Sequence, residues 1–239
     1  MQNMNWVAFA ISNTLSKSVV HLMPTSNTTN APYPVTYEIT LHAKEFGSKT
    51  ITLDDGRLGQ PDGVRLEDIF PVLNDSPAGL LALSIEMSTS QPKVDLSASK
   101  CVVEIITASN SVRFYAKQIA KSSDESIKGM LAVNDAYNFS SLLIVNCSEQ
   151  QLNSNLLVLD SRNTALNFNN QAMPLIDSNT AMEYNFDEKF YSSVEAQECS
   201  WGLFRSNSIS LAESLPAKAI AYAVYRDTLT KRIISVEAL

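Results

Sequence analysis

The segment spanning residues 52–63 combines acidic side chains, glycines and an arginine, so it is the first place where chemistry is expected. Asp54, Asp55 and Asp62 offer carboxylate oxygens, the ligands that calcium prefers, and the glycines allow a tight chain path. The segment lacks the regular acidic spacing and the terminal Glu of an EF-hand loop. Its Asp-Gly pairs are typical of turns, and the favoured interpretation is a long surface loop before a short helix.

Two arginines give the same region a second possible chemistry. Arg57 lies inside the segment and Arg65 follows it. Guanidinium groups bind carboxylates and phosphates through paired hydrogen bonds, so these two residues could receive an anionic ligand. The residues predicted to contact a ligand or partner here are Asp54, Asp55, Arg57, Asp62 and Arg65.

A second candidate contact region holds an excess of aromatic residues between positions 184 and 201. Its members Phe190, Tyr191 and Trp201 are predicted contact residues, because exposed aromatic rings can stack on sugars or anchor a partner chain. Packing in a core or between modules is the alternative and the commoner use of such side chains.

Histidines and cysteines do not form a recognisable metal or redox motif in the sequence. His21 and His42 are the only histidines, and no cysteine or carboxylate cluster lies near them, so no metal site is predicted. Cys101, Cys147 and Cys199 are widely spaced and contain no CxxC pair, which argues against both a disulfide framework and a zinc site. The first two fall in apolar runs and are expected to be buried thiols.

The motifs of common enzymes are also missing from the sequence. It contains no GxSxG elbow, no Walker loop and no GxGxxG segment. The neighbouring acids at 54–55 and 187–188 would point to opposite faces of a strand, which is unsuitable for a catalytic pair. We therefore predict a protein without a cofactor and without catalysis, and keep a hydrolase acting on carbohydrate as an alternative.

Charge and composition exclude other classes of partner. The 239-residue chain has a net charge of -7, and no stretch concentrates Lys and Arg, so neither nucleic acid nor an anionic membrane is expected to bind. Residues 1–10 have no positive region, and the apolar run 6–11 is too short for a signal peptide or a membrane span. A cytoplasmic location is favoured; a secreted or periplasmic protein whose leader has been removed is the alternative.

Hydrophobic periodicity predicts an all-β fold. Val35, Tyr37, Ile39 and Leu41 alternate with polar residues, and the same period of two recurs at Leu81, Leu83, Ile85 and Met87. Clusters of Asn, Ser, Asp, Pro and Gly separate these runs and are typical of turns. The best helical piece, residues 64–73, is short.

An internal repeat predicts two modules. Residues 63–87 align without gaps on residues 202–226, so that 81–85 falls on 220–224 with its alternation in phase. Agreement in phase has physical content, because a slip by one residue would reverse every inward and outward side chain. A single large domain remains the alternative to tandem duplication.

The first and last strands of the two copies are also predicted to correspond. Each copy begins with an apolar run that ends in Asn, at 8–13 and at 142–146. The last strand of the second copy, 233–238, would match 102–107 of the first after a shorter hairpin.

These patterns predict two tandem antiparallel β-sandwiches, immunoglobulin-like or jelly-roll in topology. Module 1 spans residues 1–117, a connection spans 118–137, and module 2 spans 138–239. We expect a non-catalytic binding or scaffolding protein that uses loops or edge strands, with a protein partner or self-association. The alternatives are a β-sandwich hydrolase and a self-assembling structural subunit.

Overall fold

The fold is known from a computed structural model. It describes residues 2–24, 34–54, 63–75, 78–92, 94–119, 128–132, 138–152, 154–158, 171–172, 175–185, 201–206 and 218–238. For residues 2, 128–132, 138, 154–158, 171–172 and 201–206 it describes the backbone but not the side chains.

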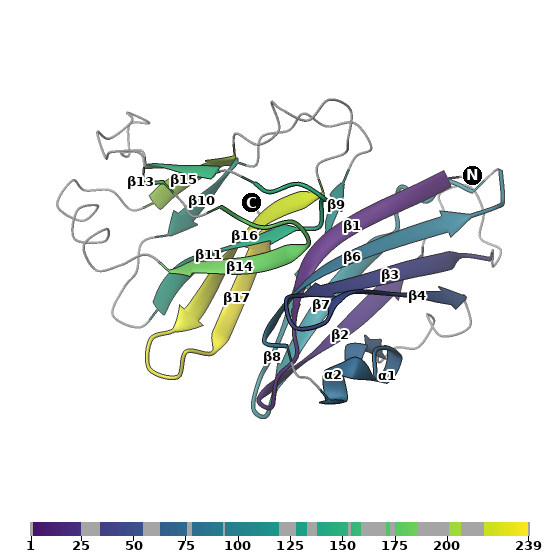
Figure 1. The fold of residues 1–239 in the computed structure, drawn as a ribbon, viewed down its shortest axis with the longest axis horizontal. Coiled ribbons are helices and arrows are strands. Elements are labelled where there is room, and N and C mark those ends of the chain that lie inside the picture. Colours follow the sequence, from purple (N-terminus) through teal and green to yellow (C-terminus); the bar gives the residue numbers. More distant parts are fainter. Residues whose placement is uncertain are drawn as a thin grey trace. The chain divides into compact units, whose positions relative to one another are not determined.

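The regular secondary structure of the described residues is almost entirely β-strand, which confirms the all-β prediction (Figure 1). Two helices of four residues each, α1 (Leu66–Ile69) and α2 (Val72–Asp75), occupy the short segment in which helix was predicted. No described helix has the length and apolar character needed to cross a membrane.

The chain separates into two compact units. The first comprises Met1–Lys121 with Asn179–Ala181, and the second comprises Ser122–Ser178 with Met182–Leu239. The predicted domain bounds stay a prediction, because much of 118–137 lies outside the described residues.

One sheet of the first unit has five strands in the order β4-β3-β6-β1-β9, all antiparallel. Their bounds are β1 (Gln2–Ile11), β3 (Thr36–Ala43), β4 (Gly47–Asp54), β6 (Leu80–Thr89) and β9 (Lys117–Ile119). The other sheet has the order β5-β2-β7-β8 and contains β2 (Ser16–Met23), β5 (Val64–Arg65), β7 (Lys100–Thr107) and β8 (Ser111–Tyr115).

The alternation predicted from the sequence fills the core of this unit. Tyr37, Ile39 and Leu41 of β3 are buried, while Glu38 between them is exposed. Leu81, Leu83, Ile85 and Met87 of β6 are buried in the same way. Because β6 pairs with both β1 and β3, these side chains lie at the middle of the sheet, where burial is greatest.

Two features connect the sheets of the first unit. The ring of Phe9 from β1 stacks on the ring of Phe114 from β8, with centroids 4.7 Å apart. Ala116 separates β8 from β9, so the chain passes from one sheet into the other within a single residue.

The second unit contains two further sheets. One has the order β14-β11-β16-β17, and the other has the order β10-β15-β12-β13. The bounds are β10 (Lys128–Ala132), β11 (Asn138–Asn146), β12 (Ser154–Val158), β13 (Gln171–Ala172), β14 (Thr180–Asn185), β15 (Trp201–Ser206), β16 (Ala219–Asp227) and β17 (Ile233–Ala238). Leu143, Val145, Tyr222 and Val224 are among the buried residues of β11 and β16.

The pairing of β11 with β16 follows the same register as the pairing of β1 with β6. Ala10 lies opposite Leu81 in the first unit, and Val145 lies opposite Ile220 in the second. Just beyond these pairs, the backbone N–H of Ser12 donates to the carbonyl of Gly79. The backbone N–H of Cys147 donates to the carbonyl of Lys218 in the same relation to its strands.

The last strands of the two halves pair differently. β7, which contains residues 102–107, lies between β2 and β8, in a sheet that does not include β6. β17 pairs with β16, the strand whose register resembles that of β6. The expected correspondence of 233–238 with 102–107 is therefore not seen in the strand pairing.

Candidate functional site on the polar face of the β5-β2-β7-β8 sheet

Glu104 forms the centre of a polar cluster on one side of this sheet, which we call the polar face. The Glu104 side chain is only 8% exposed, although it lies in the apolar run of β7. Its Oε2 lies 2.8 Å from Nε2 of His21 on β2 and 3.0 Å from Nη2 of Arg113 on β8. The Ser111 side chain is hydrogen-bonded to Glu104 as well. A buried carboxylate needs such partners because desolvation of an unpaired charge is costly.

The strand register explains why these side chains meet. Arg65, Val19, Glu104 and Arg113 lie opposite one another on β5, β2, β7 and β8. Residues directly opposite in antiparallel strands point to the same face, so these four form one row across the sheet. His21 belongs to the next row, whose other members on β7 and β8 are Val102 and Tyr115.

The charged partners keep the Glu104 carboxyl ionised. Burial raises its pKa, but the hydrogen bonds from Arg113, His21 and Ser111 and the positive charge of Arg113 outweigh burial and lower it overall. A general acid at neutral pH needs the opposite, a raised pKa. Glu104 therefore acts as a fixed anion that orients His21 and Arg113.

Gly63 joins the end of the predicted Gly-rich segment to this cluster. Its φ is +69°, in the left-handed region that favours glycine. A Cβ at this position would lie 2.6 Å from Cγ1 of Val19 and 2.7 Å from Nδ1 of His21. The residue must be Gly for the chain to pass this closely over the His21 ring into β5.

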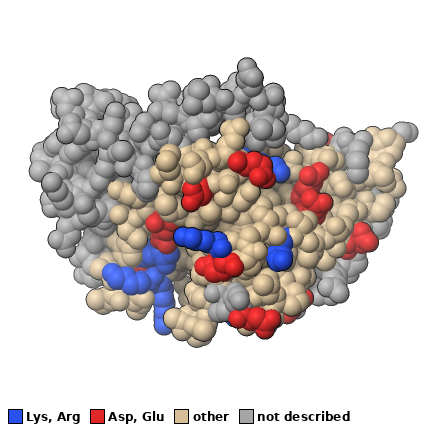
Figure 2. Space-filling model, viewed as in Figure 1, with Lys and Arg blue, Asp and Glu red and all other residues tan. Residues whose placement is uncertain are grey.

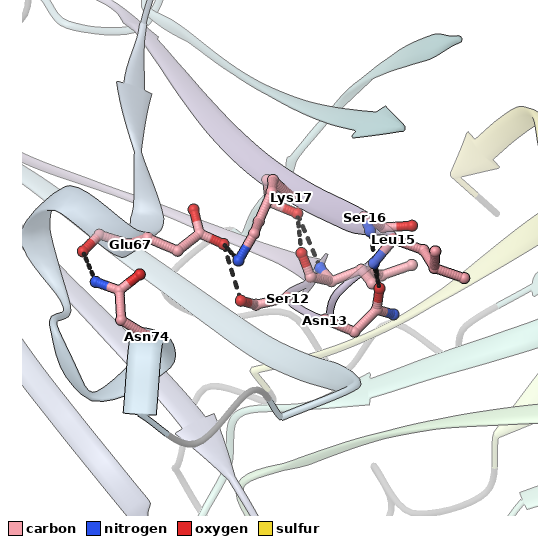
Figure 3. Close-up of polar contacts among 9 residues, drawn as sticks. Ser12, Asn13, Leu15, Ser16, Lys17, Glu67 and Asn74 are labelled. Carbon is pink, nitrogen blue, oxygen red and sulfur yellow. Dashed lines mark hydrogen bonds and ion pairs between the residues drawn. The ribbon is translucent and has the colours of Figure 1, made fainter. Parts of the chain in front are cut away.

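A second network fixes helix α1 beside the start of β2 (Figure 3). The Ser12 hydroxyl donates to Oε1 of Glu67 over 2.8 Å, and Nζ of Lys17 lies 3.4 Å from the same oxygen. The side-chain amide of Asn74 donates to the Glu67 carbonyl over 3.4 Å. Glu67 is buried, so its contacts hold the strand β5 and helix α1 in position next to the polar face.

The Asn13 side chain organises the turn between β1 and β2. Its Oδ1 accepts hydrogen bonds from the backbone N–H groups of Leu15 and Ser16, each over 2.8 Å (Figure 3). This is the Asx-type turn for which Asn is suited. It sets the direction in which β2 leaves the turn and therefore where Lys17 and His21 point.

The predicted contact residues of the Gly-rich region are only partly described. Asp54 ends β4 and Arg65 ends β5, and both are exposed. Arg65 stands in the same row as Arg113, so the structure brings this predicted residue to the polar face. Asp55, Arg57 and Asp62 lie outside the described residues.

The predicted aromatic contacts stay a prediction. Phe190 and Tyr191 lie outside the described residues. Trp201 begins β15, where its backbone pairs with Ala132 of β10, and its side chain is not described.

The sequence analysis missed the association of His21, Glu104 and Arg113. His21 and Glu104 are separated by 83 residues, and a strand pairing at that distance leaves no local pattern. The available signal was Glu104 itself, a charged residue within an apolar run, since a buried charge requires a partner. His42, expected on a polar strand face, is buried and its Nδ1 lies 2.7 Å from the Ser48 hydroxyl.

The described part of the chain contains no cluster of metal-binding side chains, and the two cysteines in it are buried. No group of three or more His, Cys, Asp or Glu side chains there could hold a metal ion. Cys101 and Cys147 are buried free thiols, as predicted. Burial raises the pKa of both, that of Cys147 to about 12 against the opposing charge of Lys218.

The second unit contains a half-buried ion pair of its own. Nε and Nη2 of Arg226 donate to the two carboxylate oxygens of Glu183, each over 2.8 Å. The Ser141 hydroxyl donates to the same carboxylate. These groups come from β16, β14 and β11, so the paired arrangement connects neighbouring strands of one sheet.

Charges on the visible surface are mixed in sign. On the described part of the face seen in Figure 2, acidic and basic side chains are interspersed among uncharged ones. On this part of the surface, a charge preference would come from a few neighbouring residues, because no broad field of one sign is seen there.

Neither a scan against protein-family models nor a search of curated proteins finds a match to this chain. No family therefore assigns a role to the polar face, and its chemistry has to be read from its own side chains.

Proposed function

We propose that the chain is a non-catalytic binding or scaffolding protein, built from tandem β-sandwich modules that present loops and edge strands to a partner. The polar face carries this proposal. Its buried ionisable groups are occupied with one another, while Arg65, Arg113 and Tyr115 extend from the same face and are exposed. Internally paired groups with exposed neighbours suit recognition better than turnover.

A contact between the two sheets of the first unit supports the β-sandwich part of the proposal. Phe9 and Phe114 belong to different sheets and stack on each other, as expected where sheets pack face to face. An immunoglobulin-like or jelly-roll topology stays open.

The register of paired strands supports the proposed duplication. The offset between Leu81 and Ile220 is the one given by the sequence repeat. Leu81 pairs with Ala10 of β1, and Ile220 pairs with Val145 of β11. The hydrogen bonds of Ser12 with Gly79 and Cys147 with Lys218 support the same correspondence. The different pairing of β7 and β17 limits it to the central strands.

Affinity capture with matched variants tests the proposed function. Tagged full-length chain is mixed with an extract of its native host, and bound proteins are compared for the wild type, Arg65→Glu and Lys44→Glu. Both substitutions change the charge equally, but Lys44 lies in the turn between β3 and β4. A partner retained by Lys44→Glu and lost with Arg65→Glu supports the proposal. Turnover of a panel of carbohydrates by the purified chain contradicts it in favour of the hydrolase.

Strand β4 favours a second candidate, a self-assembling structural subunit. β4 is an eight-residue edge strand in which only Leu53 is buried, and its centre is Thr50, Ile51 and Thr52. Long exposed edges with β-branched residues are prone to pair with another chain. Sedimentation velocity over a range of concentrations tests this: Thr50→Lys should abolish any assembly, whereas Lys44→Glu should leave it unchanged.

A further inference from the structure

We propose that strand β8 is the docking edge for an extended acidic segment of a partner protein, which adds to the β5-β2-β7-β8 sheet as a further strand. This inference rests on the proposed binding function and names the surface and the chemical class of the partner. β8 is the outer strand of its sheet, and among the described strands only β7 pairs with it.

Backbone hydrogen bonds show which groups of β8 face the open side. The N–H of Thr107 donates to the carbonyl of Asn110, and the N–H of Ala116 donates to the carbonyl of Cys101. These two bonds are at the two ends of the β7–β8 ladder, and both belong to hydrogen-bonded pairs of the same register. Such pairs alternate with non-hydrogen-bonded pairs along an antiparallel ladder.

The alternation makes Ser111, Arg113 and Tyr115 the non-hydrogen-bonded residues of β8. Their backbone N–H and C=O groups therefore point away from β7, toward the open edge. An added strand needs those groups, since main-chain hydrogen bonds provide the affinity in this mode of recognition.

The side chains of the same three residues lie on the polar face, beside the open edge. Arg113 is 65% exposed and Tyr115 is 64% exposed. Arg113 uses Nη2 for Glu104, which leaves further guanidinium N–H groups for a second carboxylate. On β7, Lys100 is exposed and lies on the same face as Glu104, four residues away along the strand.

This arrangement selects an acidic and partly apolar segment. Arg113 and Lys100 are cations, and the nearest carboxylate of the row, Glu104, is buried and already paired. The exposed ring of Tyr115 lies between the cations and offers an apolar surface to a side chain at the alternate position. Alternating acidic and apolar residues in an extended chain match this pattern at a period of two.

A second copy of this chain is a poorer occupant of the same edge. Two β8 strands paired antiparallel would place the Arg113 side chains of both copies along one face. Like charges facing each other across strands are destabilising. The acidic partner removes this repulsion.

The test uses a fluorescein-labelled octapeptide of alternating Glu and Val, with the Lys–Val octapeptide as its charge-reversed counterpart. Fluorescence anisotropy at low ionic strength measures binding to the full-length chain. We expect saturable binding of the Glu–Val peptide and at least about tenfold weaker binding of the Lys–Val peptide.

Substitutions at Tyr115 separate the backbone contribution from that of the side chain. Tyr115→Pro removes an N–H that points to the open edge, a position where an edge strand tolerates proline. Tyr115→Val removes the ring and retains the N–H. We expect Tyr115→Pro to abolish peptide binding and Tyr115→Val to weaken it by a factor of about 2–5, with unchanged circular dichroism for both.

Substitutions at two lysines test the charge preference without touching the Glu104 cluster. Lys100→Glu should weaken Glu–Val binding by a factor of about 5. Lys49→Glu makes the same change of charge on β4, an edge of the other sheet, and should have no effect.

Three results of the peptide-binding measurements would overturn the inference. The first is no saturable binding of the Glu–Val peptide up to about 1 mM. The others are equal binding of the Lys–Val peptide and full binding of the Glu–Val peptide by a folded Tyr115→Pro protein. A dimer that Tyr115→Pro disrupts would also overturn it, in favour of pairing between copies. None of these outcomes decides the capture experiment with Arg65→Glu, so the proposed binding function can survive the loss of this docking edge.

Discussion

A single buried carboxylate organises the polar face. Glu104 lies among β-branched residues of β7, where an apolar side chain would pack without a polar partner. It draws His21 and Arg113 together from strands on either side of β7. Such an ion pair adds little net stability compared with an apolar replacement, but it fixes the orientation of its members.

Replacing Glu104 tests this role through pH. Glu104→Gln keeps the size of the side chain and removes its charge, and should lower the free energy of unfolding at neutral pH by about 1–3 kcal/mol. The pKa of Glu104 is lowered in the folded protein, so its stabilisation is present above the ordinary value of 4.5 and is lost as the pH falls through the folded value. Urea unfolding from about pH 7 to pH 3 should show the difference shrinking on acidification.

The matched control is Glu38→Gln, on an exposed position of β3. It should change the free energy of unfolding by less than about 0.5 kcal/mol at neutral pH. A difference between Glu104→Gln and the wild type that stays constant over the whole range would contradict the assigned role.

Thiol reactivity gives a second prediction for single residues. In a Cys199→Ser background, Cys101 and Cys147 should resist Ellman's reagent at pH 8, because burial raises the pKa of both thiols and excludes the reagent. Both should react once the chain is unfolded in guanidinium chloride. Rapid labelling of the native protein would show that one of the two sites is open.

Residue types and their sequence neighbours predicted some of these side-chain environments but not all of them. The burial of Cys101 and Cys147 followed from their apolar neighbours in the sequence. The pairing of Glu104 with His21 did not, because it depends on the register of two strands that lie far apart in the chain. The sequence indicates that a buried Glu104 requires a polar partner, but the strand pairing determines that the partners are His21 and Arg113.

At the level of elements, the entry into β5 depends on the absence of a side chain at Gly63. This residue combines a positive φ with close contacts to Val19 and His21, whereas Gly47 has a positive φ and open space around it. Gly79 has neither constraint. A comparison of the three glycines therefore distinguishes the effect of backbone strain from the effect of steric overlap.

Alanine substitution at these glycines should give graded losses of stability. Gly63→Ala should lower the free energy of unfolding by about 2–5 kcal/mol, Gly47→Ala by about 1–2 kcal/mol and Gly79→Ala by less than about 0.5 kcal/mol. Denaturant unfolding of the three variants measures the series. Equal losses for Gly63→Ala and Gly47→Ala would mean that the contact with His21 is easily relaxed.

The hydrophobic alternation in the sequence predicted the strands better than it predicted what covers each of their faces. The period of two gave the buried faces of β3 and β6 correctly, since alternation reports directly on which side is covered. It failed for His42, which is buried on the side expected to be polar and contacts Ser48 in the neighbouring strand. The face of a middle strand depends on what lies above it, and local sequence does not contain that information.

At the scale of the whole molecule, the tandem arrangement predicts two units that can be separated. Limited proteolysis should cut within 118–137, outside the paired strands β9 and β10, and leave two fragments that each retain β circular dichroism, because cleavage between two compact units leaves the core of each intact. Mass spectrometry locates the cut. Degradation of the whole chain without stable fragments would support the single-domain alternative.

The one-residue passage at Ala116 has a mechanical consequence. β8 is bonded to β7 in one sheet and β9 to β1 in the other, so the two sheets share a continuous backbone at this corner. Displacement of β8 relative to β1 would have to break the ladder between β9 and β1. A pull exerted along β8 is therefore transmitted into β1 through Ala116.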